Sequence, residues 1–298
     1  MKHLITDIQR FSLNDGPGIR TTVFFKGCNM RCAWCHNPET LSMTPELMFY
    51  PSKCIGCGKC FGACPVGAHR MENGEHIIDR KLCESCGQCT EVCYAEALVM
   101  SGKEMTIDEI LSEVRQDKAY YETSGGGVTL SGGEVLCHVE FAAELAEACH
   151  REGISVAIET NLSRPYEHIK PLLDKVDVIM ADLKILDDEL HQKYTGLSNQ
   201  TTIENIQRIR EIPMIIRTPL IHGVTATEEN LRGIAKLLRG KENLIYYQLL
   251  NFNPLGASKY QGLDAENPFS DLRPYTDDQM KAFGRMLADI EIPVKVGE

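Results

Sequence analysis

The stretch Cys28-Asn29-Met30-Arg31-Cys32-Ala33-Trp34-Cys35 places three cysteines within eight residues. Three thiolates are one fewer than a closed structural zinc site uses. A cubane iron–sulfur cluster held by three cysteines keeps one iron open to a substrate or cofactor. The alternative is a zinc knuckle with a distant fourth ligand such as His36. The cluster is favoured because more cysteines with cluster spacing follow directly.

Two further cysteine runs, which begin at Cys54 and Cys83, have the x2-x2-x3 spacing of bacterial ferredoxins. A proline normally follows the last cysteine of such a run; it is present as Pro65 in the first run, and Tyr94 takes its place in the second. In ferredoxins the fourth cysteine of each run binds the cluster of the other run. Two zinc ribbons fit this spacing poorly. The expected ligand sets for two [4Fe–4S] clusters are therefore Cys54, Cys57, Cys60 with Cys93, and Cys83, Cys86, Cys89 with Cys64.

The charge and the apolar segments of the chain argue against several classes of partner. The chain has 31 Lys and Arg against 42 Asp and Glu, a net charge of −11, and no basic run, which argues against a nucleic-acid partner. The sequence opens without an apolar leader segment and has no stretch of membrane-spanning length, so neither secretion nor a membrane partner is expected. Cluster thiolates need a reducing compartment, and we expect a cytoplasmic protein.

Strand and helix patterns alternate along the chain outside the cysteine-rich stretch. Apolar runs predict strands at Thr21–Phe25, Val128–Leu130, Ser155–Ile158, Val178–Ala181, Met214–Arg217, Leu244–Leu250 and Pro293–Val296. Amphipathic patterns predict helices at Ile107–Arg115, Val139–Glu152, Tyr166–Leu173, Thr202–Glu211, Glu228–Arg239 and Asp277–Ile290. Regular βα alternation implies parallel strands with right-handed crossovers.

The expected fold class is therefore α/β, a partial (β/α)6 TIM-like barrel with an inserted ferredoxin-type domain. Six full βα units are fewer than the eight of a complete barrel. We expect residues 1–49 and 103–298 to form the barrel and residues 50–102 to form the two-cluster domain, which interrupts the first crossover.

Polar groups follow the strands where each strand ends. After the first strand comes the three-cysteine loop, and the later strands are followed by Ser131–Glu134, Glu159–Asn161, Asp182–Lys184, Arg217 and Asn251–Asn253. Ligands gather at the carboxyl ends of the strands in parallel barrels, so we expect these groups to share one site. Taken alone, the glycines at 132 and 133 also fit an ordinary turn, Asp182 and Lys184 fit a structural ion pair, and Trp34 fits the core.

At this point the residues resemble a known family. The CxxxCxxC motif with an aromatic residue before its third cysteine resembles the radical S-adenosylmethionine enzymes. The strings Asp15–Thr21, Phe24–Cys28, Cys35–Pro38, Thr123–Glu134 and Asp182–Lys184 resemble the glycyl radical enzyme activating enzymes in particular. The ferredoxin insert is similar to the longer subgroup, which includes the activases of glycerol dehydratase, choline trimethylamine-lyase and pyruvate formate-lyase-like proteins.

The resemblance implies an activity. The open iron of the Cys28, Cys32 and Cys35 cluster would chelate S-adenosylmethionine, and one electron would cleave it to methionine and a 5′-deoxyadenosyl radical. That radical would take a hydrogen atom from a glycine Cα in the glycine loop of a large glycyl radical enzyme. The electron donor would be a flavodoxin or ferredoxin, and the activase itself a monomer.

The resemblance also assigns site residues. It implies cofactor contacts at Trp34, His36, Gly132, Gly133, Glu134, Thr160, Asp182, Lys184, Arg217 and Asn253, and a monovalent cation (Na or K) at Glu159, Thr160, Met180 and Asp182. Three positions depart from the short members of the family: Glu159 stands in place of Asp, Asn253 in place of His, and Leu162 in place of Gly. We also expect Asp7–Arg20, Arg217 and Asn251–Asn253 to contact the glycine loop.

Two other functions fit parts of the sequence. A radical S-adenosylmethionine enzyme could act on a small molecule, although the extra rim residues and longer C-terminal region this usually needs are not evident. A polyferredoxin electron carrier would explain the insert, but a carrier needs neither a barrel nor an open cluster. Formation of 5′-deoxyadenosine separates the carrier from both enzymes, and formation of a glycyl radical separates the two enzymes.

Overall fold

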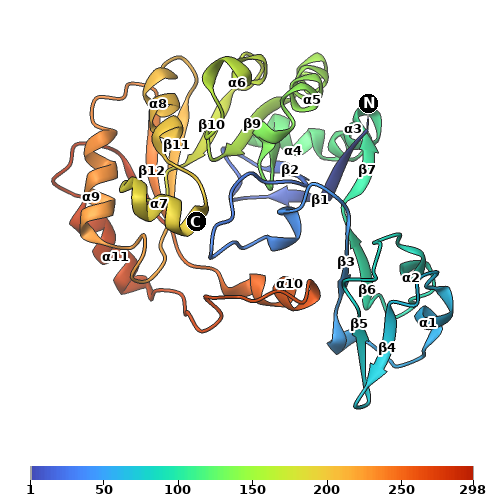
Figure 1. The fold of residues 1–298 in the computed structure, drawn as a ribbon. Helices are drawn as coiled ribbons and strands as arrows, with labels where there is room; N and C mark the ends of the chain where they lie inside the picture. Colours follow the sequence, from blue (N-terminus) through green and yellow to red (C-terminus); the bar gives the residue numbers. More distant parts are fainter. Residues whose placement is uncertain (1, 298) are drawn as a thin grey trace.

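The computed structural model describes residues 2–297 and divides them into a main lobe and a small lobe (Figure 1). The main lobe is built on a nine-stranded sheet in the order β13-β12-β11-β10-β9-β8-β2-β1-β7. Its strands are β1 Lys2–Ser12, β2 Arg20–Phe25, β7 Lys103–Thr106, β8 Gly127–Gly132, β9 Ser155–Thr160, β10 Val178–Asp182, β11 Met214–Pro219, β12 Leu244–Leu250 and β13 Val294–Val296.

Seven neighbouring strands of this sheet are parallel to one another, as the βα alternation predicted: β2, β8, β9, β10, β11, β12 and β13. All seven predicted strands are present. The antiparallel strands β1 and β7 were not predicted, because charged and polar residues interrupt the apolar residues of β1 and β7 has only four residues. The α/β prediction with a mostly parallel sheet is confirmed.

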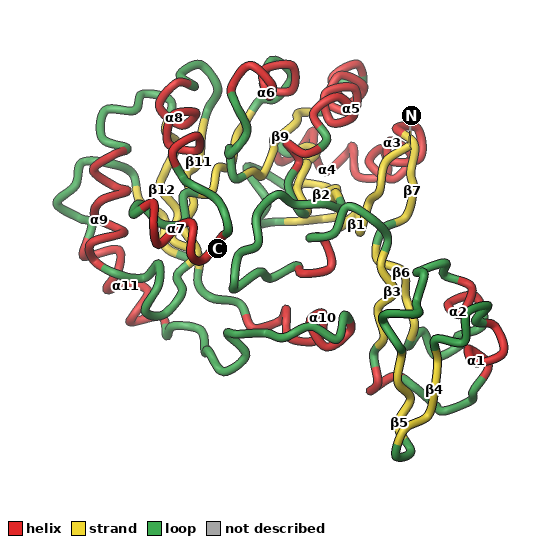
Figure 2. The backbone as a smooth tube through the Cα atoms, viewed as in Figure 1, coloured by secondary structure: helices red, strands yellow, loops and turns green. Residues whose placement is uncertain are grey.

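The helices of the main lobe are α3 Ile107–Val114, α4 Lys118–Ser124, α5 Val139–Arg151, α6 Tyr166–Leu173, α7 Asp188–Thr195, α8 Gln200–Arg208, α9 Glu228–Leu237, α10 Ala257–Gly262 and α11 Asp277–Met286. They lie around the sheet, except for α10, which lies apart from it toward the small lobe (Figure 2). The helix α3 begins with a capping box, in which Thr106 and Glu109 bond to each other's backbone N–H groups. The helices α4 and α10 were missed because they are short, and α7 because it buries only His191 and Thr195 and so has no apolar stripe.

The small lobe comprises residues 46–101 and has two small sheets of its own. Its elements are β3 Glu46–Phe49, α1 Lys59–Ala63, β4 His69–Glu72, β5 Glu75–Ile78, α2 Gln88–Glu91 and β6 Leu98–Ser101. The strand β3 pairs with β6, so this lobe begins four residues before the boundary expected from sequence. The chain leaves the main sheet after β2 and returns to it at β7.

The main core lies between the sheet and its covering helices and is almost entirely aliphatic, with side chains such as Leu130, Ile158 and Leu145 fully buried. A separate, smaller cluster in the small lobe mixes Leu47, Phe49 and Leu98 with cysteines. Among the described residues, no helix combines the length and apolar character required to cross a bilayer.

Candidate functional site

The three-cysteine loop lies directly after β2 and faces a cavity of about 220 Å³. Neighbouring backbone holds the loop in place, since the N–H of Arg31 donates to Thr195 O at 2.7 Å and that of Ala33 donates to Tyr194 O at 2.9 Å. All three thiols, of Cys28, Cys32 and Cys35, line this cavity. The structure therefore brings together the three sulfur ligands that the sequence predicted.

Burial of this loop disfavours free thiolates. It raises the pKa of Cys35 to about 12 and also raises the pKa of Cys28 and of Cys32. A metal ligand must be deprotonated, and a bound cation supplies the charge that makes this possible. Three converging thiols in a pocket lined by other polar groups fit an iron–sulfur cluster with one open position.

The other walls of the cavity come from the carboxyl ends of the neighbouring strands. Ser131 and Gly132 end β8 and are followed by Gly133 and Glu134; Glu159 and Thr160 end β9 and are followed by Asn161; Asp182 ends β10 and Lys184 lies two residues beyond it; Arg217 and Pro219 lie at the end of β11. The predicted convergence is confirmed for these four strand ends. Sequence reasoning missed Met30, Asn37, Thr40 and Leu41, which also line the cavity and belong to the cysteine loop and its exit.

The glycine turn after β8 is shaped by close packing. A Cβ on Gly132, whose φ is +109°, would lie 2.3 Å from backbone atoms of Phe25, and one on Gly133 would lie 2.3 Å from Gly27 O. Both glycines are thus needed to bring this turn against the end of β2. The same close approach places the turn beside the three-cysteine loop.

Glu134 is a buried carboxylate whose oxygens point toward protein donors. Thr160 Oγ1 donates to it at 2.6 Å, the N–H of Asn161 at 2.7 Å and the N–H of Leu136 at 3.0 Å. Its burial raises its pKa, and these three donors oppose that shift. The Glu134 side chain therefore ties the ends of β8 and β9 together, and the Thr160 hydroxyl is occupied in the same bond.

Arg217 forms the centre of a charged network at the base of the cavity. Its Nη1 donates to Glu159 Oε1 at 2.6 Å, and its Nε donates to Asp182 Oδ1 at 3.3 Å. Lys184 Nζ donates to the second oxygen of Asp182 at 2.6 Å. Burial alone would raise the pKa of Asp182, but the two cations outweigh it and the pKa is lowered. The carboxylate of Asp182 is thus held in its charged form.

Three of the four residues predicted to bind a monovalent cation, Glu159, Met180 and Asp182, contact this guanidinium, whereas Thr160 bonds to Glu134. Arg217 Nη1 lies 3.9 Å from Met180 Sδ, and Ser131 donates to the remaining oxygen of Glu159. The carboxylate oxygens are thus engaged with Arg217, Lys184 and Ser131.

A second cavity of about 650 Å³ adjoins the first and shares Trp34, His36 and Arg217 with it. Asn253 lines this second cavity, where its Oδ1 accepts from the N–H of Leu255. Trp34 is buried and packs with Tyr194 and Phe269, so one of its faces belongs to a small apolar cluster. The sixth predicted rim group, Asn251–Asn253, therefore lies in the adjoining cavity.

The adjoining cavity is also lined by the N-terminal segment, including Asp7, Leu13 and Asp15. Within this segment Gly18 has a φ of +73°, and a Cβ on it would lie 2.5 Å from the Gly126 nitrogen. Gly18 thus forms the tight turn that sets the end of the segment against β8. Leu13 and Leu255, whose side chains are exposed, also line this cavity.

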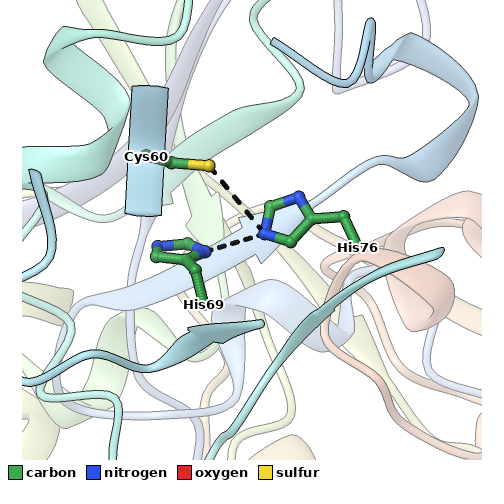
Figure 3. Close-up of side chains that lie close together, drawn as sticks. All are labelled: Cys60, His69 and His76. Atoms are coloured by element: carbon green, nitrogen blue, oxygen red, sulfur yellow. Dashed lines mark hydrogen bonds between the residues drawn. The ribbon is translucent and has the colours of Figure 1, made fainter. Parts of the chain in front are cut away.

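The small lobe contains a cavity of about 810 Å³ lined by Cys54, Cys57, Cys60 and Cys93. These are the four members of the first crossed ligand set predicted from ferredoxin spacing. Two residues that sequence reasoning did not single out, His69 and His76, lie beside Cys60 (Figure 3). The remaining set, Cys83, Cys86, Cys89 and Cys64, lies in the same lobe.

Helix α10 lies between the two lobes and was missed by the sequence analysis. Lys259 donates to Asn37 Oδ1 at 2.5 Å and to Glu39 Oε1 at 2.7 Å, which holds the exit of the three-cysteine loop. Gln261 lines the cavity of the small lobe. Arg80 of the small lobe donates to Gly262 O at 2.8 Å. The helix therefore contacts both cysteine-rich regions.

Comparison with known proteins identifies relatives of this chain. The Radical SAM superfamily model matches residues 22–238. An isethionate sulfite-lyase activating enzyme of Oleidesulfovibrio alaskensis is 41% identical over 275 residues, which cover 89% of this chain and 88% of the relative. A choline trimethylamine-lyase activating enzyme of the same organism is 36% identical over 99% of this chain and 98% of its own length.

A trans-4-hydroxy-L-proline dehydratase activating enzyme of Clostridioides difficile is 33% identical over the full length of both chains. Among solved structures, QueE of Escherichia coli matches with a TM-score of 0.52 at 12% identity, covering 100% of this chain and 94% of QueE. At that identity the likeness concerns the fold alone.

Proposed function

Because the chain belongs to the radical SAM superfamily and, within it, to the glycyl radical enzyme activating enzymes, we propose that its three-cysteine cavity cleaves S-adenosylmethionine to activate a partner enzyme. The observation that carries this proposal is the shared cavity, in which three thiols face the charged ends of β9, β10 and β11. We take the open, mostly parallel sheet as the partial (β/α)6 barrel of the resemblance.

A [4Fe–4S] cluster would be held by Cys28, Cys32 and Cys35. When bound, it supplies the electron that splits S-adenosylmethionine into methionine and a 5′-deoxyadenosyl radical, and that radical takes a hydrogen atom from the partner's glycine Cα. The residues of the chain bind and orient the substrate. In this proposal the backbone of Gly132, Gly133 and Glu134 flanks the methionine end.

The charged network orients the rest of the substrate. Lys184 and Arg217 carry the positive charge that a carboxylate of the methionine moiety needs, and Asp182 holds both of them in place. Trp34 and the backbone of His36 would contact the adenine, and Asn253 would lie at the far end of the site. No step of this proposal depends on a bound monovalent cation.

The partner's glycine loop would enter through the adjoining cavity of about 650 Å³. Its walls come from the N-terminal segment on one side and from the residues after β12 on the other. Leu13 and Leu255, exposed by 62% and 73%, offer apolar contacts at this entrance. A loop that crosses this cavity reaches the first cavity through the side chains that both share.

The small lobe is proposed to hold two [4Fe–4S] clusters, for a total of three, and to pass electrons from a flavodoxin or ferredoxin to the main lobe. Its support is the crossed set of four cysteines around one cavity and the position of α10 between the lobes. The whole protein is proposed to act as a monomer.

The experiment that tests the proposal mixes the reduced, iron-loaded protein with S-adenosylmethionine and a candidate glycyl radical enzyme. We expect methionine and 5′-deoxyadenosine to form together with the electron paramagnetic resonance doublet of a glycyl radical. Cleavage of S-adenosylmethionine without a glycyl radical in any candidate partner would instead favour a small-molecule substrate.

A further inference from the structure

The two halves of the small lobe match each other position by position. Cys54 and Cys83 begin equivalent cysteine runs, so equivalent residues differ by 29 in number. The two strand pairs follow the same offset. His69 pairs with Ile78 in one sheet, and the residues 29 positions away from these, Leu98 and Phe49, pair with each other in the other sheet. The duplication therefore extends from the cysteines to the register of the strands.

At two equivalent positions the halves carry different chemistry. His69 on β4 corresponds to Leu98 on β6, and His76 on β5 corresponds to Leu47 on β3. Both leucines are buried in the core of the small lobe. One half thus has a pair of imidazoles where the other half has a pair of apolar side chains.

The imidazoles contact cysteines of only one ligand set. His76 Nδ1 lies 3.9 Å from Cys54 Sγ, and His76 Nε2 lies 3.9 Å from Cys60 Sγ. His69 Nδ1 lies 2.9 Å from His76 Nε2. Figure 3 shows the Cys60 sulfur and the His69 ring both directed at the same nitrogen of His76, Nε2. Cys54 and Cys60 both belong to the set that lines the cavity of about 810 Å³.

The hydrogen bond between the two rings restricts where protons lie. If His69 donates to His76 Nε2, then the neutral His76 ring carries its proton on Nδ1, directed at Cys54. The opposite tautomer would turn the Nδ1 lone pair toward the Cys54 thiolate, which is unfavourable, whereas in the first arrangement the Nε2 lone pair accepts the His69 N–H at 2.9 Å. The arrangement that satisfies both neighbours therefore makes His76 a donor to Cys54.

Aromatic packing fixes the orientation of this donor. The centroid of the His76 ring lies 4.5 Å from that of Phe49 and 5.2 Å from that of Phe61. With His69 on a further side, the ring has little freedom to turn away from the cysteines. Three neighbouring rings, those of Phe49, Phe61 and His69, thus hold the His76 ring against the cysteines.

We propose that His76 is a positioning residue for the first small-lobe cluster, donating an N–H···S bond from Nδ1 to Cys54 with His69 holding the tautomer, and that this cluster has a higher reduction potential than the second. This inference rests on the proposed function, since it requires both clusters. Reduction adds negative charge to a cluster, and a hydrogen-bond donor at a ligand sulfur stabilises that charge.

The location of the first cluster gives this difference a use. Gln261 of α10 lines its cavity, and α10 also holds the exit of the three-cysteine loop through Lys259. The cluster with the higher potential therefore lies beside α10, the helix that contacts both lobes. An electron entering the small lobe would collect at this cluster.

The test uses the full-length chain with Cys28, Cys32 and Cys35 replaced by Ala, so that only the small-lobe clusters remain. His76→Leu installs the residue that the other half already has at the equivalent position. We expect a redox titration followed by electron paramagnetic resonance to show one of the two cluster signals at a potential lower by ~59 mV, which is a tenfold change in its one-electron equilibrium constant. The potential of the other cluster signal should not change. His69→Leu should shift the same signal by less, and His76→Gln, which keeps an N–H donor, should restore part of the shift.

Iron analysis separates this inference from the proposed function. About eight irons per chain with no change of potential in His76→Leu, or in His69→Leu if the first variant does not fold, would overturn the role of His76 alone. An iron content near zero in this background would overturn the two-cluster lobe and the inference together. Equal shifts of both signals would also contradict it, because His76 contacts only one ligand set.

Discussion

In the main lobe three cysteines sit on one loop of a large, rigid α/β scaffold, whereas in the small lobe eight cysteines are spread over a fold with few apolar residues. Cys28 is buried and the carboxyl ends of four strands surround it with charged groups. In the small lobe Cys57 and Cys86 are exposed, and cysteines make up part of the apolar cluster itself.

This difference separates two uses of iron. The main lobe folds around an aliphatic core and presents its thiols to a cavity that has space and charge for a substrate. In the small lobe the cysteines are themselves part of the apolar cluster, and four of them line a cavity with room for a fully ligated cluster. Chemistry is expected where a ligand position is open, and electron transfer where all positions are filled.

The largest effect is expected from removing the three cysteines of the main lobe. Replacing Cys28, Cys32 and Cys35 by Ala should lower the iron content from about twelve to about eight per chain and abolish cleavage of S-adenosylmethionine. The matched control is Cys149→Ala, which removes a fully buried cysteine that belongs to no run and should leave iron content and cleavage intact. Residual cleavage by the triple variant would place the reaction in the small lobe.

The next effect concerns the charged network. Arg217→Ala leaves Glu159 without its cationic partner, whereas Asp182 keeps the bond from Lys184. Because Arg217 lies at the base of the substrate cavity, cleavage of S-adenosylmethionine and formation of the glycyl radical should fall together, by roughly a hundredfold or more. Both are measured in one reaction by product analysis and electron paramagnetic resonance.

Arg232→Ala serves as the control, because Arg232 pairs with Asp289 on the surface of the main lobe and should leave both rates unchanged. Loss of the glycyl radical with cleavage intact in Arg217→Ala would move Arg217 from the substrate site to the partner interface.

A smaller and more selective effect is expected from the small lobe. Replacing Cys83, Cys86 and Cys89 by Ala should remove about four irons and slow cleavage driven by a flavodoxin or ferredoxin. Cleavage driven by a small chemical reductant should persist, because the main sheet has a separate core. Equal loss with both reductants would assign the small lobe a structural role.

The local elements of this molecule could be predicted from the sequence better than the contacts between distant parts of the chain. All seven parallel strands and the three-cysteine loop were predicted, because apolar runs and metal-ligand spacing are local signals. The contact of α10 with both lobes was not, since Lys259 reaches Asn37 across more than two hundred positions of the chain. The roles of Arg217 and Glu134 also depend on such long-range contacts: only the folded chain reveals that the Glu134 carboxylate is engaged by Thr160.

The smallest effect is expected at the entrance of the adjoining cavity. Leu255→Ala removes an exposed side chain that the partner would bury, and full burial of a leucine is worth about 1.5–3 kcal/mol. We expect the KM for the partner to rise by about tenfold with cleavage of S-adenosylmethionine unchanged. Ile245→Ala, at the opposite end of β12, is the control and should change neither quantity. An unchanged KM in Leu255→Ala would direct the search for the docking surface elsewhere.

The most direct test of the central claim follows one hydrogen atom. A candidate glycyl radical enzyme is prepared with deuterium on its glycine Cα carbons and activated by the reduced, iron-loaded protein. The account predicts that 5′-deoxyadenosine acquires one deuterium for each glycyl radical formed, as measured by mass spectrometry and electron paramagnetic resonance. A glycyl radical that appears while 5′-deoxyadenosine stays free of deuterium would contradict it.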